Sequence, residues 1–169
     1  MHLATLPPLA NCDRALVGAL VQDGVVLTNL ASLALPETER LQEVLGGFRD
    51  QLMMATSNGH STLRPSHDQL VADAFLWRWG LNVRLLDIVE NYLGVARRYY
   101  GADVRREVAD GRCTDVRQWH RDTEDERLFK VLIWLNNVDV DGGPFQYISR
   151  ARTARATDSL RYVTGYISD

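Results

Sequence analysis

Lysine is almost absent from this 169-residue chain: Lys130 is the only one, against eighteen arginines. Cysteine is scarce as well, because Cys12 and Cys113 are the only two and lie too far apart for a metal-binding motif. Two such cysteines are typical of free thiols in a reducing cytosol, so we expect a cytoplasmic protein. No apolar run approaches the ~20 residues that span a bilayer, and no signal peptide is recognisable, so no membrane association is predicted.

A large excess of charge of one sign is also lacking. The net charge is −3, and 24% charged and 46% hydrophobic residues are close to the values of an ordinary globular domain. A chain without a positive field does not attract nucleic acid, so nucleic acid is not an expected partner. The length suits one domain with a buried core, and we expect residues 1–169 to form it.

Hydrophobic periodicity predicts helices in the first hundred residues, so the helical part of the domain is expected over about 13–100. Asp13 can cap a first helix that Gly24 ends. A second helix is expected over 36–54, because a proline stands at its first turn and acidic residues follow. A third is expected over 82–100, with Gly101 as its stop.

After residue 101 the spacing of the apolar residues changes from the helical period to a strand-like pattern. Strand-like segments separated by Asp/Gly turns lie at 103–110, 112–120, 128–137 and 144–149. A further short strand is expected at 25–30, where β-branched residues gather. Helices followed by antiparallel-looking strands are typical of an α+β domain.

His120 and Asp122 carry the clearest chemical signal. Because side chains alternate along a strand, two residues that stand two apart can face the same side, and Gln118 shares that side. An imidazole and a carboxylate can fill two positions of an octahedral metal, and a third ligand from elsewhere would complete a facial triad. The alternative is an ordinary hydrogen-bonded pair in an unrelated α+β domain.

The strand-like run 128–136 has two different faces. Its odd positions are apolar and are expected to pack against the helices; they are Phe129, Val131, Ile133 and Leu135. Its even positions include Lys130, Trp134 and Asn136 and are expected to face a partly polar interior. A lysine on an inward face is costly unless it pairs with an anion. Anion binding and an edge lysine whose stem reaches solvent remain alternatives for Lys130.

The segments QWHRD (118–122) and VLIWLNNVDVDGGPFQYI (131–148) resemble the Fe(II)/2-oxoglutarate-dependent dioxygenases of the phytanoyl-CoA dioxygenase family. The similarity lies in an H-x-D pair, a strand that ends in a turn, an acidic loop, and a Gly-Gly-Pro before a further strand. The resemblance implies N-terminal helices packed on an antiparallel double-stranded β-helix, a jelly-roll or cupin-like fold. Its strands would occupy about 102–169.

The resemblance also implies an activity. Members of the family decarboxylate 2-oxoglutarate with O₂ to succinate and CO₂, and hydroxylate a C–H bond of a small-molecule substrate. His120 and Asp122 would be two of the three Fe(II) ligands, and an aspartate at position 122 favours hydroxylation over halogenation. The residues expected on the cofactor side are Gln118, Lys130, Trp134 and Asn136.

The chain departs from the family pattern near its C-terminus. The family has a distal histidine followed by an arginine that binds 2-oxoglutarate, whereas no histidine follows His120. An eight-stranded jelly roll does not fit into the remaining length, so the chain resembles the N-terminal two-thirds of such an enzyme, without the C-terminal strands. Exposed sheet edges would favour a homo-oligomer. A non-catalytic remnant that serves as a binding or interaction module is the alternative to an enzyme.

Overall fold

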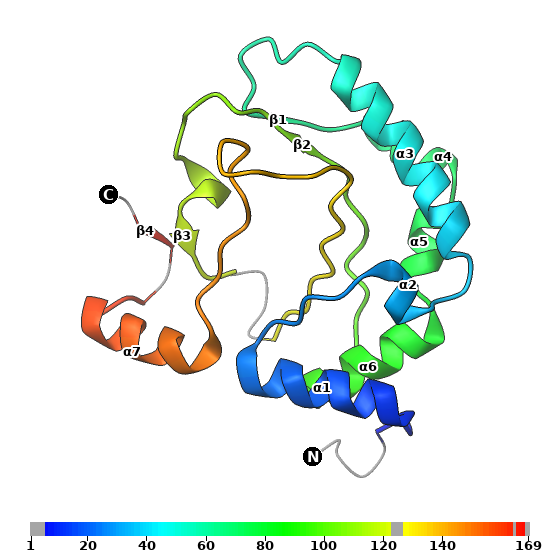
Figure 1. The fold of residues 1–169 in the computed structure, drawn as a ribbon, viewed down its shortest axis with the longest axis vertical. Coiled ribbons are helices and arrows are strands. Elements are labelled where there is room, and N and C mark those ends of the chain that lie inside the picture. The colour runs from blue at the N-terminus through cyan, green and yellow to red at the C-terminus, as the bar shows by residue number, and fades with distance from the viewer. Residues whose placement is uncertain (1–5, 123–126, 164, 168–169) are drawn as a thin grey trace.

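The computed structural model describes residues 6–122, 127–163 and 165–167 (Figure 1). The helices are α1 (Asn11–Asp23), α2 (Leu30–Leu33), α3 (Thr38–Met54), α4 (His67–Ala72), α5 (Phe75–Gly80), α6 (Val83–Leu93) and α7 (Arg150–Leu160), and a 3₁₀ helix covers Asp115–Arg117. The strands are β1 (Thr62–Leu63), β2 (Arg106–Glu107), β3 (Trp119–His120) and β4 (Tyr166–Ile167).

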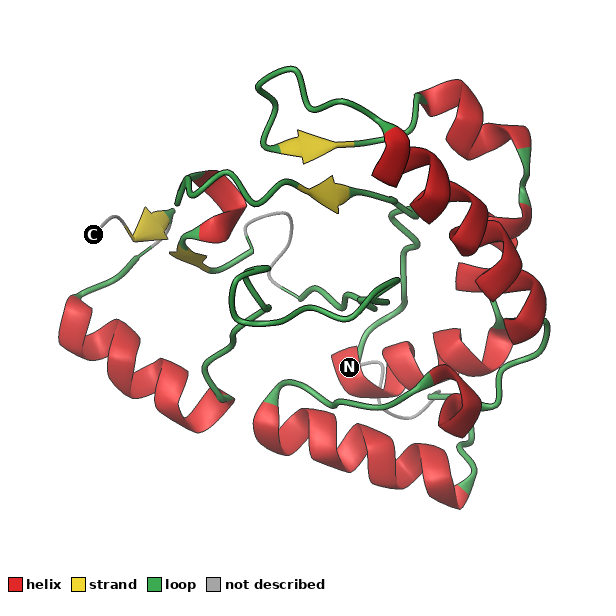
Figure 2. Cartoon of the chain, turned by 45° about the horizontal axis from the view of Figure 1, so that its top comes forward, coloured by secondary structure: helices red, strands yellow, loops and turns green. Residues whose placement is uncertain are grey.

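Helices α1 to α6 form an arc, and the segment that leads to α7 crosses the inside of this arc (Figure 1). Long segments without helix or strand, green in Figure 2, connect the small sheets. No helix in the described part of the chain is long and apolar enough to cross a membrane.

Glycines in the left-handed conformation end two of the main helices. Gly24, at φ +79°, follows α1 and donates its N–H to the carbonyl oxygen of Leu20, as the sequence predicted. Gly94, at φ +67°, ends α6 in the same way, through the carbonyl oxygen of Glu90. The expected helix over 82–100 is therefore too long, because its stop is Gly94 and not Gly101.

The predicted strand at 25–30 is wrong. Residues 25–29 belong to no helix or strand, and Leu30 already begins α2. The Asn29 side chain caps α2 by accepting a hydrogen bond from the Ser32 backbone N–H at 2.8 Å. A β-branched run becomes a strand only where a neighbouring strand pairs with it. The second predicted helix corresponds to α3.

Leucines of α3 and aromatic residues of α5 form the core. Phe75 is fully buried, and the guanidinium of Arg40 lies 4.6 Å from the centre of its ring. The buried cluster consists of Leu35, Leu41, Leu45, Leu52, Phe75, Leu76, Trp79, Leu85 and Val104. The core therefore lies in the helical half, and from the later part of the chain Ile133 and Leu135 pack against it.

Two antiparallel pairs of two-residue strands make up the sheets of the described residues. β1 pairs with β2, and β3 pairs with β4 so that His120 stands opposite Tyr166. The fold is thus a mixture of helices and small antiparallel sheets, and these residues contain no double-stranded β-helix. The jelly roll stays a prediction drawn from the resemblance.

The expected strands over 128–137 and 144–149 are not formed. Within the described chain, residues 131–138 make no backbone–backbone hydrogen bond. The alternation of side chains is nevertheless partly present: Ile133 and Leu135 pack against the core, whereas Trp134 is 48% exposed. Phe129 packs edge-on against Tyr92 of α6, but Val131, expected to be buried, is exposed.

Candidate functional site

His120 lies where two strands that are distant in the sequence meet. It is the last residue of β3, opposite Tyr166 of β4, and the two rings are in edge contact with their centres 5.2 Å apart. The side chain is 24% exposed. The imidazole therefore stays in contact with solvent over part of its surface.

A hydrogen bond determines which nitrogen of His120 can accept. Nδ1 lies 2.7 Å from the backbone carbonyl oxygen of Gln118. A carbonyl oxygen only accepts, so Nδ1 carries the proton, and in the neutral ring Nε2 has the lone pair. Histidines that ligate metals through Nε2 commonly donate their other N–H to a carbonyl or carboxylate in this way.

Asp122 converges with His120, as the spacing of two predicted. Its Oδ1 lies 3.7 Å from Nε2 of the imidazole. A lone pair and a carboxylate repel each other unless a proton or another cation lies between or beside them. The arrangement therefore favours a positive charge at this point of the molecule.

Lys130 supplies one such charge. Its Nζ lies 2.7 Å from the same Oδ1 of Asp122, and both side chains are about two-fifths exposed, at 43% and 41%. Ion pairs at this exposure contribute little to stability. The ammonium does, however, occupy a position on the carboxylate that a metal ion would compete for.

The pair fits two positions of a metal site and no more. At metal–ligand distances of about 2.1 Å, neighbouring ligands of a six-coordinate ion lie about 3.0 Å apart. The 3.7 Å between Nε2 and Oδ1 exceeds this separation by about 0.7 Å, so the two atoms would have to move closer to hold one ion. Among the residues that the structure describes, no group of three His, Cys, Asp or Glu side chains could hold a metal ion.

The other predicted cofactor-side residues behave differently. Gln118 takes part through its carbonyl oxygen. Trp134 makes its ring contact with Phe145, at 6.1 Å between centres, and Asn136 donates its side-chain N–H to the carbonyl oxygen of Asn137. The structure therefore brings together His120, Asp122 and Lys130, whereas the contacts of Trp134 and Asn136 lie elsewhere.

Two tyrosines that the sequence interpretation missed support this site. Tyr162 accepts a hydrogen bond from the Arg121 backbone N–H at 3.1 Å and donates its own hydroxyl to the carbonyl oxygen of Gly165. Tyr166 contacts the His120 ring. No local pattern could have found them, because they lie about forty residues away in the sequence.

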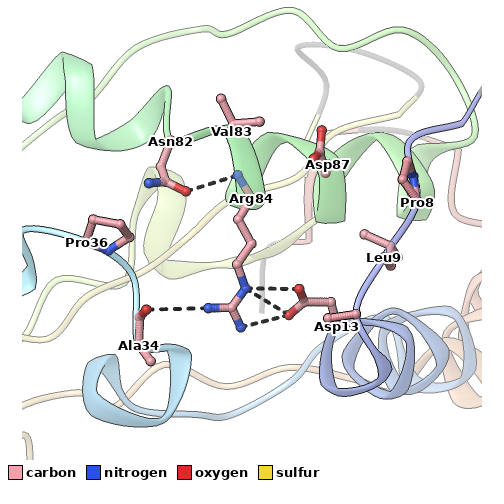
Figure 3. A pocket seen from close by; sticks show the side chains of 10 residues that line it. Pro8, Leu9, Asp13, Ala34, Pro36, Asn82, Val83, Arg84 and Asp87 are labelled. Atoms are coloured by element: carbon pink, nitrogen blue, oxygen red, sulfur yellow. Dashed lines mark hydrogen bonds and ion pairs between the residues drawn. The ribbon is translucent and has the colours of Figure 1, made fainter.

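Apart from the His120 site, a hollow of about 590 Å³ lies between α1, α2 and α6 (Figure 3). Arg84 extends across its base to Asp13, donating to the carboxylate from Nε at 2.9 Å and from Nη2 at 2.8 Å, while Nη1 donates to the carbonyl oxygen of Leu33. These hydrogen bonds lower the pKa of Asp13, against the opposing effect of burial. Because the guanidinium of Arg84 in α6 donates hydrogen bonds to Asp13 in α1 and to Leu33 in α2, it joins these three helices.

A third polar cluster surrounds Asp110. Its pKa lies well below the usual range, because the Ser61 hydroxyl, the Arg112 backbone N–H and the Arg117 guanidinium all donate to the carboxylate. Arg117 also donates to the carbonyl oxygens of Ser61 and Val108. The cluster joins the 3₁₀ helix to the β1–β2 sheet, so its hydrogen bonds have a structural role.

No family model matches this chain, and no similar protein was found among the curated proteins or the solved structures.

Proposed function

We propose that this chain is an Fe(II)- and 2-oxoglutarate-dependent oxygenase of the phytanoyl-CoA dioxygenase type, hydroxylating a C–H bond of a small-molecule substrate. The observation that carries the proposal is the orientation of His120. Its Nδ1 proton is held by the carbonyl of Gln118, and its Nε2 is directed toward Asp122 at 3.7 Å. A histidine fixed in this way is prepared to bind a metal beside a carboxylate.

Each residue has a distinct role in this proposal. His120 and Asp122 hold Fe(II), which supplies the oxidative chemistry with O₂ and 2-oxoglutarate when it is bound. The hydrogen bond to Gln118 fixes the tautomer and orientation of the imidazole. Lys130 pairs with Asp122 in this structure, and its ammonium would be available to the anionic 2-oxoglutarate if Asp122 served as a metal ligand. A third ligand is required from outside the described residues.

The proposal is tested by metal binding and by turnover on the full chain. Mn²⁺ is a redox-stable probe that broadens the NMR signals of nearby residues, so it should broaden those of His120 and Tyr166 first. In a form of the enzyme that also supplies the third ligand, Fe(II), 2-oxoglutarate and O₂ should give succinate. His120→Ala and Asp122→Ala should each abolish both effects, because one lost ligand leaves the ion mispositioned.

His60→Ala is the matched control. His60 is exposed and lies near the β1–β2 sheet, so its removal should change neither Mn²⁺ broadening nor succinate release. If Mn²⁺ broadens other residues and leaves those around His120 unaffected, the metal assignment is wrong.

A metal-free binding module is the second candidate, and the position of Lys130 favours it. With Nζ at 2.7 Å, Asp122 already has a cationic partner. Lys130→Met distinguishes the two functions, because it keeps the stem and removes the charge. For the oxygenase it should raise Mn²⁺ affinity several-fold and weaken 2-oxoglutarate binding. For a metal-free module, no variant should bind Mn²⁺ at this position.

A further inference from the structure

A small cleft lies apart from the His120 cluster, between α3 and residues 133–135. Its volume is about 220 Å³, and no residue of the His120 cluster lines it. Four residues of α3 form one wall: Gln42, Leu45, Gly46 and Arg49. Their spacing of three, four and seven places them on a single helix face. The opposite wall contains Ile133, Trp134 and Leu135.

Gly46 is not explained by the packing of the chain itself. A glycine within a helix is unfavourable compared with alanine, and its φ is not positive. A Cβ built at this position meets no atom of the described chain within 4 Å. The glycine therefore leaves open space over the helix backbone where α3 lines the cleft. Such positions allow the close approach of a ligand.

The two ends of the cleft wall differ in chemistry. Leu45 is 7% exposed and provides an apolar floor. Arg49 stands one turn further along α3, and its Nε and Nη2 reach only the neighbouring Asp50, at 2.9 and 2.8 Å. Its Nη1 makes no hydrogen bond to any described residue, and the side chain is 46% exposed. A guanidinium with a donor to spare beside an apolar floor suits a carboxylate group on an apolar body.

We propose that this cleft binds a small organic carboxylate with an aromatic or branched apolar body. The body lies over Gly46 between Leu45 and Trp134, and the carboxylate accepts hydrogen bonds from Arg49. The volume of 220 Å³ is below the ~300 Å³ of typical ligand pockets. It therefore limits the ligand to one ring or a short acyl chain. The proposal does not depend on the function proposed for His120.

Benzoate, its neutral isostere benzamide, and succinate are the probes. Backbone amide shifts of Gly46 and the indole N–H of Trp134 are followed by NMR during titration of the full chain. Benzoate should shift both signals with a Kd on the order of a millimolar, as expected for so small a ligand. Benzamide should bind about tenfold more weakly because it lacks the charge-assisted hydrogen bond. Succinate, which has no apolar body, should bind more weakly than benzoate.

Matched variants distinguish an effect on ligand binding in the cleft from an effect on the stability of α3. Gly46→Leu and Gly47→Leu both place a good helix former in α3, and a Cβ at Gly47 also meets no described atom within 4 Å. Only Gly46→Leu should abolish benzoate binding, because only Gly46 lines the cleft. Arg49→Met should remove the preference for benzoate over benzamide. Asp50→Asn should instead increase benzoate affinity severalfold, because it releases the guanidinium.

The increase with Asp50→Asn is a result that a purely structural role for Arg49 does not produce. The proposal is overturned if benzoate shifts neither signal at 20-fold above the ~1 mM expected, or if it binds Gly46→Leu and the wild-type chain equally. Equal binding of benzoate and benzamide to the wild-type chain would likewise exclude a carboxylate site.

Discussion

Removing the charge of Asp13 should destabilise the whole helical half of the chain. Asp13 is 3% exposed, and its carboxylate receives hydrogen bonds from Nε and Nη2 of Arg84. Arg84 stands on α6, Asp13 stands on α1, and a third bond from Arg84 reaches the carbonyl oxygen of Leu33 in α2. In Figure 3 the guanidinium lies between these elements. Asp13→Asn keeps the size of the side chain and leaves Arg84 without its counter-charge.

The magnitude follows from the burial of the two partners. Breaking a fully buried ion pair by removing one partner costs about 3–5 kcal/mol. The Arg84 side chain is 34% exposed, so water solvates part of the uncompensated charge. We therefore expect Asp13→Asn to lower the free energy of unfolding by about 2–3 kcal/mol. For a chain of this length, that is a fall in Tm of about 4–12 °C.

Urea unfolding, with the midpoint and the slope fitted separately, measures this effect. The midpoint should fall at an unchanged slope, because the surface exposed on unfolding is the same. Asp23→Asn is the control, because Asp23 is exposed at the other end of α1, and it should change stability by less than about 0.5 kcal/mol. If Asp13→Asn costs no more than the control, the pair does not tie the helices together.

The same pair makes stability depend on pH. Because the Arg84 hydrogen bonds lower the pKa of folded Asp13, the unfolded carboxyl, with a pKa near ~3.9, takes up its proton at a higher pH than the folded one. The stabilisation that ionised Asp13 provides is complete above the pKa of the unfolded carboxyl and is lost as the pH falls through the pKa of the folded one. Asp110, whose pKa is also lowered, adds a second such loss. The difference between the wild-type and Asp13→Asn acid curves therefore isolates the Asp13 contribution.

Three further predictions concern other parts of the chain. Gly80→Ala should destabilise by about 1–3 kcal/mol in urea unfolding, because its Cβ would lie 2.8 Å from ring carbons of the half-buried Tyr99; an unchanged midpoint would contradict that packing. Gly47→Ala should stabilise by up to about 1 kcal/mol, because the position is helical, exposed and open; a loss of stability would point to a hidden contact. Residues 131–138, whose backbone is unpaired within the described chain, should favour self-association that grows with concentration. Light scattering measures it, and a monomer at every concentration would refute it.

Several features of this fold were predictable because they depend on neighbours in the sequence. Gly24 ends α1, and α3 covers most of the predicted second helix. Caps, glycine stops and helical periodicity act within a few residues, so the local sequence contains what they need. The convergence of His120 and Asp122 belongs to the same class, because a spacing of two along an extended backbone places both side chains on one side.

The remaining features depend on which distant segments meet. The sequence predicted Gly101 as the end of α6, but the helix ends at Gly94; both glycines adopt a positive φ, so the local rule does not distinguish them. Residues 25–29 and 131–138 have strand-like sequences, but no neighbouring strand pairs with them in the described chain. A strand exists only through its hydrogen-bonded partner, and its own residues do not specify that partner.

The sequence by itself determined the main helices and the proximity of the imidazole to its carboxylate. Tertiary structure alone decided that Lys130 pairs with Asp122, that Tyr166 packs on His120, and that Arg84 joins α1 to α6. These contacts are made by side chains whose positions depend on the packing of the whole chain. Spacing along the sequence determines the relative positions of side chains only a few residues apart. The relative positions of distant side chains depend on the core that brings their segments together.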